Sequence, residues 1–81
     1  MYDDDESEAA RKFLREMKLS PRECDVVLGV TLQDLTNREI GENLGLSKRT
    51  IETHREHALR KLGIHGTVDL CKFVFIGIAP K

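Results

Sequence analysis

The sequence contains no apolar segment long enough to cross a membrane. Its most apolar run, Phe73–Ala79, is far shorter than the roughly 20 residues that a membrane-spanning helix needs. The acidic N-terminal segment, MYDDDESE, has no apolar centre, so we do not expect a signal peptide. With 81 residues, the chain is long enough for one small domain built from a single layer of packed helices. These features predict a cytoplasmic protein with no membrane partner.

Cysteine and catalytic motifs are equally scarce. Cys24 and Cys71 lie far apart, without a CxxC motif, and we interpret both as small buried side chains in a reducing compartment. His54 and His57 have no third ligand nearby, so we expect neither a metal nor a cofactor. The chain also lacks a glycine-rich phosphate loop, a carboxylate pair in a pocket and a nucleophile with an adjacent base, which argues against an enzyme.

The charge is unevenly distributed. Although the formal net charge is −1, five of the fourteen acidic residues lie within the first eight positions. Residues 47–62, in contrast, carry five basic residues and two acidic ones. A basic stretch of this kind is typical of nucleic-acid binding, although a merely solvated helix face would also explain it.

The first two predicted helices are defined by an apolar stripe and by a capping sequence. We expect residues 1–6 to be disordered and Ser7 to cap a helix over about 8–17. Ser20, with Glu23 three residues later, predicts a capping box that starts a second helix at Pro21. We expect that helix to end near residue 33 or 34. The stripe of the first helix consists of Ala10, Phe13, Leu14 and Met17.

The segment from residue 36 to residue 62 predicts two helices joined by a tight turn. Thr36 and Glu39 form a second predicted capping box, which opens a helix over 37–44. Gly45 can adopt the left-handed conformation that ends a helix, and Gly41 allows the two helices to cross closely. Ser47 is then expected to cap a longer helix over 48–62. This order of cap, small residue, glycine and second cap predicts a helix-turn-helix.

The longer helix has two different faces at about 100° per residue. Ile51, Ala58, Leu59 and Leu62 gather on one side, and Arg49, Glu52, Thr53, Glu56 and Arg60 gather on the other. The second face lacks large apolar groups, so it suits a DNA groove better than a protein core. Arg55 falls nearer the inner side. We expect it to pair with Glu39 or Glu23, because a buried unpaired guanidinium group is costly.

The last predicted helix is apolar nearly all round. We expect Gly63 to end the preceding helix and Thr67 to cap a final one that continues through Phe75. One side of this helix must close the core. The other side has two interpretations: homodimerisation, which we favour, or burial beneath the first helix.

Three segments resemble the LuxR-type, or GerE-like, DNA-binding domain: LSPREC (19–24), LTNREIGENLGLSKRTIETHR (35–55) and LRKLGIHGTVDL (59–70). The resemblance covers about residues 19–75. It implies an all-α, four-helix helix-turn-helix domain over 19–77, preceded by an acidic tail and an additional helix or linker over 1–18 and followed by a tail over 78–81. The implied function is sequence-specific binding of double-stranded DNA as a bacterial transcriptional regulator, or as a response regulator output domain. The implied partners are a second copy of the chain on an inverted-repeat promoter site, and RNA polymerase.

The same resemblance implies roles for individual residues. Glu52, Thr53 and Glu56 occupy positions that reach base edges. Contacts with DNA phosphates, or positioning of the helices, are implied for Arg38, Ser47, Lys48, Arg49, Thr50, Arg55 and Lys61. Dimerisation is implied for Val68, Cys71, Lys72 and Phe75.

The sequence departs from the family pattern at two places. One residue more than usual lies between Val26 and Asn37, and Asp34 stands where the family prefers glycine. Glu56 is acidic where a basic or polar residue is more usual, although a carboxylate can accept from the amino group of cytosine. Two alternatives stay open: a protein-interaction module on the same fold, favoured by the overall acidity, and a sigma-factor-like domain associated with RNA polymerase.

Overall fold

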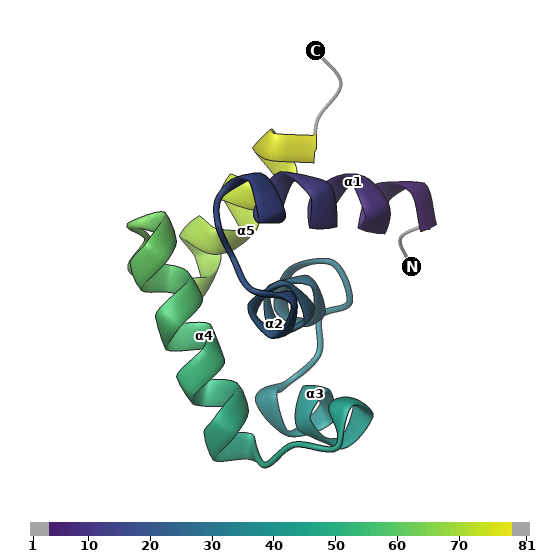
Figure 1. The fold of residues 1–81 in the computed structure, drawn as a ribbon, viewed down its shortest axis with the longest axis vertical. Helices are drawn as coiled ribbons and strands as arrows, with labels where there is room; N and C mark the ends of the chain where they lie inside the picture. The colour runs from purple at the N-terminus through teal and green to yellow at the C-terminus, as the bar shows by residue number, and fades with distance from the viewer. Residues whose placement is uncertain (1–3, 79–81) are drawn as a thin grey trace.

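The computed structural model describes residues 4–78, which form five helices and no strand (Figure 1). These are α1 (Asp4–Glu16), α2 (Pro21–Thr31), α3 (Asn37–Leu44), α4 (Lys48–Leu62) and α5 (Thr67–Ile78). The described part of the chain is therefore all-α, as the sequence predicts. Helices α2 to α5 form the four-helix arrangement, and α1 is the additional N-terminal helix.

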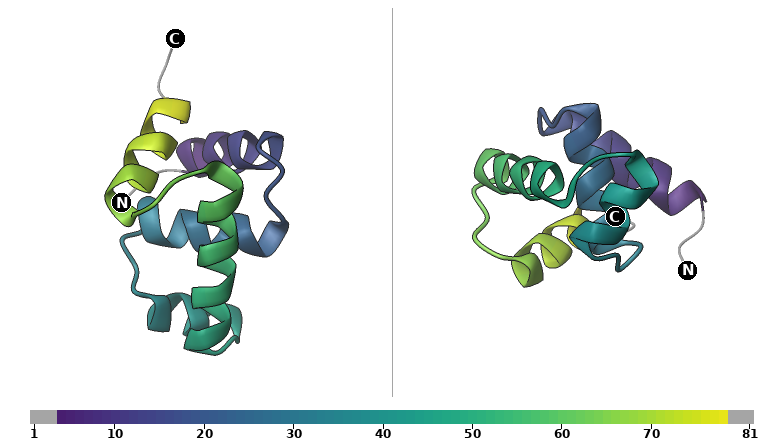
Figure 2. Two further views of the ribbon diagram at one scale, coloured as in Figure 1. Left: turned by 90° about the vertical axis from the view of Figure 1, so that its left-hand side faces the viewer. Right: turned by 90° about the horizontal axis from the view of Figure 1, so that it is seen from below.

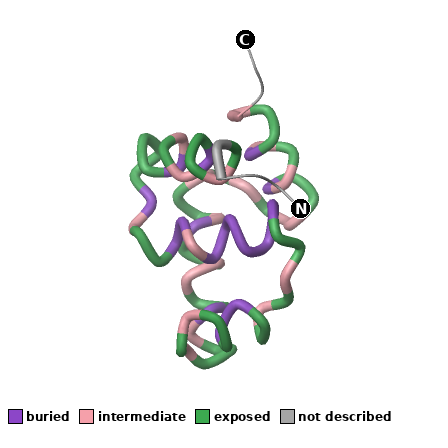
Figure 3. Tube along the Cα trace, turned by 90° about the vertical axis from the view of Figure 1, so that its right-hand side faces the viewer, coloured by how far each residue is buried: buried purple, intermediate pink, exposed green. Residues whose placement is uncertain are grey.

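Helix α2 is the centre of the structure. It contacts each of the other four helices, and Figure 1 shows α1 and α5 on one side of it and α3 on the opposite side. Figure 3 shows α2 as the most continuously buried part of the trace. Because Gly29 and three valines give this helix a weak intrinsic propensity, packing on all sides must supply much of its stability.

The core receives side chains from every helix, but in unequal numbers. Its largest completely buried side chains are Leu14, Cys24, Val26, Val27, Ile51, Leu70 and Val74. Helix α3 buries two residues, Ile40 and Gly41, and α4 also buries two, Ile51 and Ala58. Most of the surface of α3 and α4 therefore remains in contact with solvent.

The predicted helix caps are confirmed for α2, α3 and α4. In the first capping box, the Ser20 hydroxyl accepts from the Glu23 amide at 3.2 Å, and the Glu23 carboxylate accepts from the Ser20 amide at 2.8 Å. Thr36 and Glu39 form the second box in the same way, and Ser47 caps α4. The left-handed glycines predicted to end α3 and α4 are Gly45 (φ 71°) and Gly63 (φ 68°).

The predicted start of the first helix is wrong. Helix α1 already begins at Asp4, so Ser7 lies inside it and does not cap it, and residues 4–6 are helical rather than disordered. Residues 1–3, which belong to the same expectation, lie outside the described residues. Acidic residues in a first turn stabilise a helix because they face the positive end of its dipole. That favours a start earlier than the apolar stripe indicates.

The bounds of α2 and α5 also differ from the predictions. Helix α2 ends at Thr31, two or three residues before the predicted end. Helix α5 includes Thr67 as its first residue instead of being capped by it, and it continues to Ile78, beyond the predicted Phe75. After α2 the chain turns through Asp34, which has a left-handed φ of 53°. Glycine is the residue that adopts this conformation without strain. The family preference for glycine at this position therefore has a visible backbone cause.

Helix α1 packs against one side of α5. Its Ala10 and Leu14 are completely buried, and the rings of Phe13 and Phe73 lie 5.2 Å apart. A Cβ atom added to Gly77 would collide with the Phe13 ring. Burial beneath α1 thus accounts for one side of α5.

Candidate nucleic-acid interface

Helices α3 and α4 are joined by a tight turn that fixes their crossing. The amide of Leu46 donates to the carbonyl of Gly41 at 2.8 Å. A Cβ atom at Gly41 would lie 2.5 Å from the carbonyl oxygen of Leu46, so only glycine fits there without a shift of the backbone. The small residue predicted for the crossing is therefore confirmed, and its closest neighbour is the turn itself.

Helix α4 presents one polar face to solvent along its whole length. In the left-hand view of Figure 2, which is turned by 90° from the view of Figure 1, α4 lies at the front of the molecule. Ile51 and Ala58 point into the core and are completely buried, whereas the opposite side is exposed. We call this exposed side the outward face; it consists of Arg49, Glu52, Thr53, Glu56 and Arg60.

Both glutamates of the outward face are paired with basic side chains along the helix. Lys48 lies 3.9 Å from Glu52, and Arg60 lies 3.4 Å from Glu56. The Thr53 hydroxyl donates to the backbone carbonyl of Arg49 at 3.1 Å. Exposed pairs of this kind contribute at most about 1 kcal/mol, so a nucleic acid can replace them readily.

The turn hydroxyls and the exposed arginine of α3 also have partners. The Ser47 oxygen accepts from the Thr50 amide at 3.1 Å, and the two hydroxyl groups lie 2.9 Å apart. Arg38 bonds to Glu42, one turn later in α3, at 3.2 Å. Ser47 and Thr50 lie at the N-terminal end of α4. Ser47 and Thr50 thus have a capping role that any phosphate contact would have to accommodate.

The predicted partner of Arg55 is wrong. Its guanidinium group donates to the side-chain oxygen of Asn37 at 3.4 Å, while Glu39 bonds to Thr36 and Glu23 is occupied elsewhere. The hydrogen bonds between Glu39 and Thr36 lower the pKa of the Glu39 carboxyl group. Arg55 is half-buried, so a neutral amide together with solvent satisfies it. It links α4 to the first turn of α3, a contact between residues 18 apart that no local pattern indicates.

The carboxylate of Glu23 pairs with Lys61 instead. The two groups lie 2.7 Å apart, and the Glu23 side chain is only 5% exposed. Burial raises the pKa of Glu23, but the hydrogen bond and charge of Lys61, together with the hydrogen bonds of Ser20, outweigh it and lower the pKa below its ordinary value. Lys61 also approaches the carbonyl of Lys18 at 3.4 Å. Lys61 thus connects the end of α4 to the start of α2.

The side of α5 not covered by α1 is apolar and exposed. The exposed fractions on this side are 69% for Val68 and 36% for Phe75, whereas Ile76, which is 76% exposed, borders α1. Lys72 is exposed on the same side, and Cys71 is half-buried. The prediction that both cysteines are buried is correct for Cys24 and wrong for Cys71. Burial raises the pKa of the Cys24 thiol.

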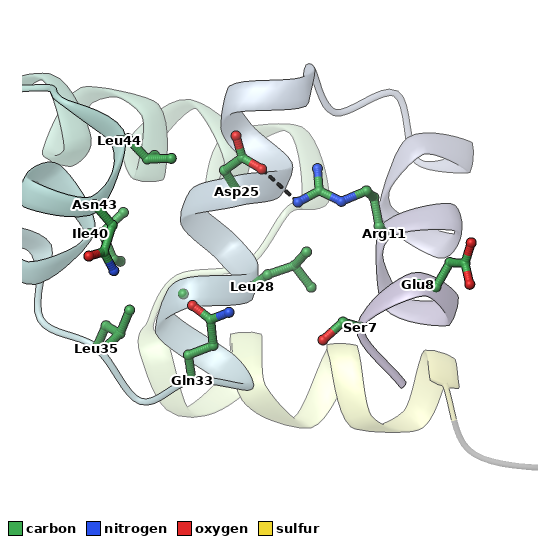
Figure 4. Close-up of a pocket in the computed structure, with 11 residues that line it drawn as sticks. Ser7, Glu8, Arg11, Asp25, Leu28, Gln33, Leu35, Ile40, Asn43 and Leu44 are labelled. Carbon is green, nitrogen blue, oxygen red and sulfur yellow. Dashed lines mark hydrogen bonds and ion pairs between the residues drawn. The ribbon is translucent and has the colours of Figure 1, made fainter. Parts of the chain in front are cut away.

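A groove of about 510 Å³ lies between α1, α2 and α3 (Figure 4). Leu28, Ile40 and Leu44 contribute apolar side chains to it. Across its rim, Arg11 of α1 bonds to Asp25 of α2 at 2.6 Å. The pair fastens α1 to α2 beside the helix-turn-helix.

Two kinds of site are absent from the described residues. Within residues 4–78, no group of three histidine, cysteine or acidic side chains is placed to bind a metal ion. Over the same residues, no helix has the length and apolar character needed to span a membrane.

Comparisons with known proteins agree with the helix-turn-helix that α3 and α4 form. A family model described as bacterial regulatory proteins of the luxR family matches residues 17–74. The chain is 44% identical over 64 residues to the transcriptional regulatory protein MctR of Rhizobium johnstonii; this alignment covers 78% of the chain and 29% of MctR. No solved structure gives a significant match.

Two further relatives have similar names. Over 46 residues the chain is 40% identical to the C4-dicarboxylate transport transcriptional regulatory protein DctR of Rhodobacter capsulatus, covering 57% of the chain and 23% of DctR. Over 59 residues it is 39% identical to the transcriptional regulatory protein TdiR of Thauera aromatica, covering 73% of the chain and 26% of TdiR. The chain therefore matches less than a third of the length of these relatives.

Proposed function

Because the chain belongs to the LuxR family of bacterial regulatory proteins, a family of DNA-binding transcriptional regulators, we propose that α4 enters the major groove of its target DNA. The observation that carries this proposal is the outward face of α4, which is polar and exposed over about three turns while Ile51 and Ala58 hold the helix in the core. A major groove is wide enough to admit one helix, and base edges are read there.

The basic residues around α4 are proposed to hold the DNA backbone. Lys48 and Arg49 lie in the first turn of α4, where the positive end of the helix dipole also favours phosphate. Arg38 on α3 is 82% exposed and can reach a neighbouring phosphate by leaving Glu42. Arg55 and Lys61 act as positioning residues, because their side chains bind Asn37 and Glu23 within the protein. Glu52, Thr53 and Glu56 are left to read the bases.

Homodimerisation through α5 is proposed to place two copies on an inverted repeat. Val68 and Phe75, with Lys72 between them and Cys71 at the edge, form an apolar strip on the side of α5 that α1 does not cover. Exposed apolar surface of this kind often marks a contact between proteins. We propose the cytoplasm as the location, since bacterial DNA lies there, and RNA polymerase as a further partner in transcription.

Selection of bound duplexes from a random pool tests the proposed DNA binding. We expect an inverted repeat to be enriched, and we expect affinity to fall steeply with salt because phosphate contacts release counterions. Arg49→Gln should weaken binding to all duplexes, whereas Arg15→Gln, a matched change on α1, should not. Failure to enrich any duplex sequence, or binding that is insensitive to salt, would favour the protein-interaction alternative.

Sedimentation of the purified chain tests the proposed dimer. Phe75→Glu and Val68→Glu should shift the chain towards monomer and weaken binding to the inverted repeat. Met17→Glu is the control, because Met17 has a similar exposed fraction, 37% against 36% for Phe75, but lies just after α1. Equal effects of the three substitutions would count against α5 as the interface.

A further inference from the structure

We infer that the base-reading residues of α4 offer only hydrogen-bond acceptors, so that the helix selects cytosine on the DNA strand it faces. The inference rests on the proposed function and deepens it, because it specifies the chemistry of the recognised bases. Three side chains carry it: Glu52, Thr53 and Glu56.

Thr53 has already used its hydrogen-bond donor. Its hydroxyl donates to the carbonyl of Arg49, four residues earlier, at 3.1 Å. Bonding of this kind is a common alternative for threonine within a helix. A hydroxyl group has one hydrogen to donate and two lone pairs, so the group that Thr53 presents to solvent is an acceptor oxygen next to a methyl group.

The two glutamates are acceptors by their chemistry. Their side chains are 51% and 70% exposed, for Glu52 and Glu56 respectively. At about 100° per residue, positions 52 and 56 lie about 40° apart around the helix, with Thr53 at the edge of the same sector. The acceptors therefore form one continuous strip on the side of the helix away from the buried Ala58.

The intrahelical ion pairs allow carboxylates to approach DNA. Lys48 and Arg60 lie at opposite ends of the strip, 3.9 Å from Glu52 and 3.4 Å from Glu56. Each pair nearly cancels the charge that phosphate groups would repel. In the complex, each cation can move to a phosphate while its carboxylate turns towards the base edge.

Base chemistry then selects among the four nucleotides. In the major groove, guanine presents two acceptors and thymine presents an acceptor and a methyl group. Adenine presents a donor beside the acceptor N7, whereas cytosine presents a donor alone. A carboxylate is therefore satisfied by cytosine, partly opposed by adenine, and repelled by guanine. Thr53 fits the same amino group or, through its methyl group, a thymine.

The experiment compares duplex selection by the wild-type chain, by Glu56→Gln and by Glu42→Gln. Glutamine both donates and accepts, which matches adenine N6 and N7. We expect wild type to enrich cytosine at one position in each half-site, and Glu56→Gln to change that position to adenine. Replacing that cytosine by guanine should weaken wild-type binding roughly tenfold. Circular dichroism of each variant checks that the helices are retained.

Glu42→Gln is the matched control. Glu42 is 66% exposed and pairs with Arg38 one turn away, so the substitution makes the same change of charge beside a similar ion pair, but on α3. It should leave the enriched sequence unchanged. Thr53→Val keeps the shape and one methyl group but removes the acceptor, and it should relax preference at a second position.

The outcomes separate the two proposals. If the wild-type chain enriches no sequence, the proposed function fails and the inference fails with it. If it enriches an inverted repeat that stays the same in Glu56→Gln, the proposed function stands and the inference is overturned. A change shared by Glu56→Gln and Glu42→Gln would reflect net charge alone and would also overturn it.

Discussion

Replacing Lys61 by methionine removes the ammonium group that faces Glu23 and keeps a side chain of similar length. The Glu23 carboxylate is 5% exposed and lies 2.7 Å from that ammonium group. Without Lys61 the carboxylate keeps its hydrogen bonds with Ser20 but loses its counter-charge in a site that water scarcely reaches. The substitution is therefore expected to destabilise the fold.

The size of the effect follows from the exposure of the two groups. A hydrogen bond to a charged group contributes about 1.5–3 kcal/mol, and breaking a fully buried pair costs about 3–5 kcal/mol. Lys61 is 43% exposed, so solvent screens part of the interaction and the lower range applies. We expect Lys61→Met to lower the free energy of unfolding by about 2 kcal/mol. For a domain of this size, that lowers the melting temperature by about 10 °C.

Urea and thermal unfolding measure this effect independently of DNA binding. Lys48→Met is the control, because the Lys48–Glu52 pair is exposed at both ends and 3.9 Å long, and its loss should cost less than about 0.5 kcal/mol. A double-mutant cycle with Glu23→Gln isolates the interaction. If Lys61→Met and Lys48→Met change stability equally, or if the cycle gives no coupling, the reasoning from burial is wrong.

The same pair predicts how stability depends on pH. The pKa of Glu23 is lower in the folded chain than its ordinary value. Its contribution is therefore fully present above the ordinary pKa and is lost as the pH falls through the folded pKa. Unfolding measured between neutral pH and pH 3 should show a smaller acid-induced loss in Glu23→Gln than in wild type. An identical loss in the two proteins would contradict this assignment.

Three further predictions concern packing and backbone geometry. Gly41→Ala should destabilise the chain by more than about 2 kcal/mol and weaken DNA binding, because the added methyl group meets the backbone carbonyl of Leu46. Gly29→Ala meets the buried side chain of Ile40 instead of backbone and should cost less, and unfolding of both variants tests this order. Asp34→Gly should stabilise the chain by about 0.5 kcal/mol by relieving its left-handed backbone, and a melting temperature below wild type would refute that. Phe13→Ala should cost about 3 kcal/mol, measurable in urea, and near-wild-type stability would show that α1 adds little to the fold.

Local sequence signals predicted most helix ends. A capping box such as Ser20 with Glu23 depends on residues only three positions apart, so the sequence pattern predicts it. The glycines that end α3 and α4 also act through local backbone conformation, and the sequence predicts them equally well. The start of α1 is predicted too late because an apolar stripe indicates only the residues that contact the core, whereas α1 begins at Asp4, before the stripe.

Contacts between residues far apart along the chain could not be predicted from the sequence. The outward face of α4 follows from helical periodicity and needs no knowledge of its neighbours. The partners of Arg55 and Lys61 depend instead on how α4 crosses α3 and the start of α2, at separations of 18 and 38 residues. The prediction of a carboxylate partner for Arg55 rests on its place nearer the inner side of the helix, where a buried unpaired guanidinium group would be costly. The half-buried position of Arg55 makes Asn37 sufficient.

The packing of α1 has a consequence for how the protein can be divided. Family similarity spans residues 17–74 and so begins one residue after α1 ends. Yet Leu14 and Ala10 are as inaccessible to water as any side chain in the molecule. We expect a fragment that begins at residue 17 to expose the apolar surfaces of α2 and α5 that α1 covers. We also expect it to melt at a lower temperature than the whole chain and to aggregate. In this protein, the segment that we expect to fold as one unit is longer than the segment that the family model matches.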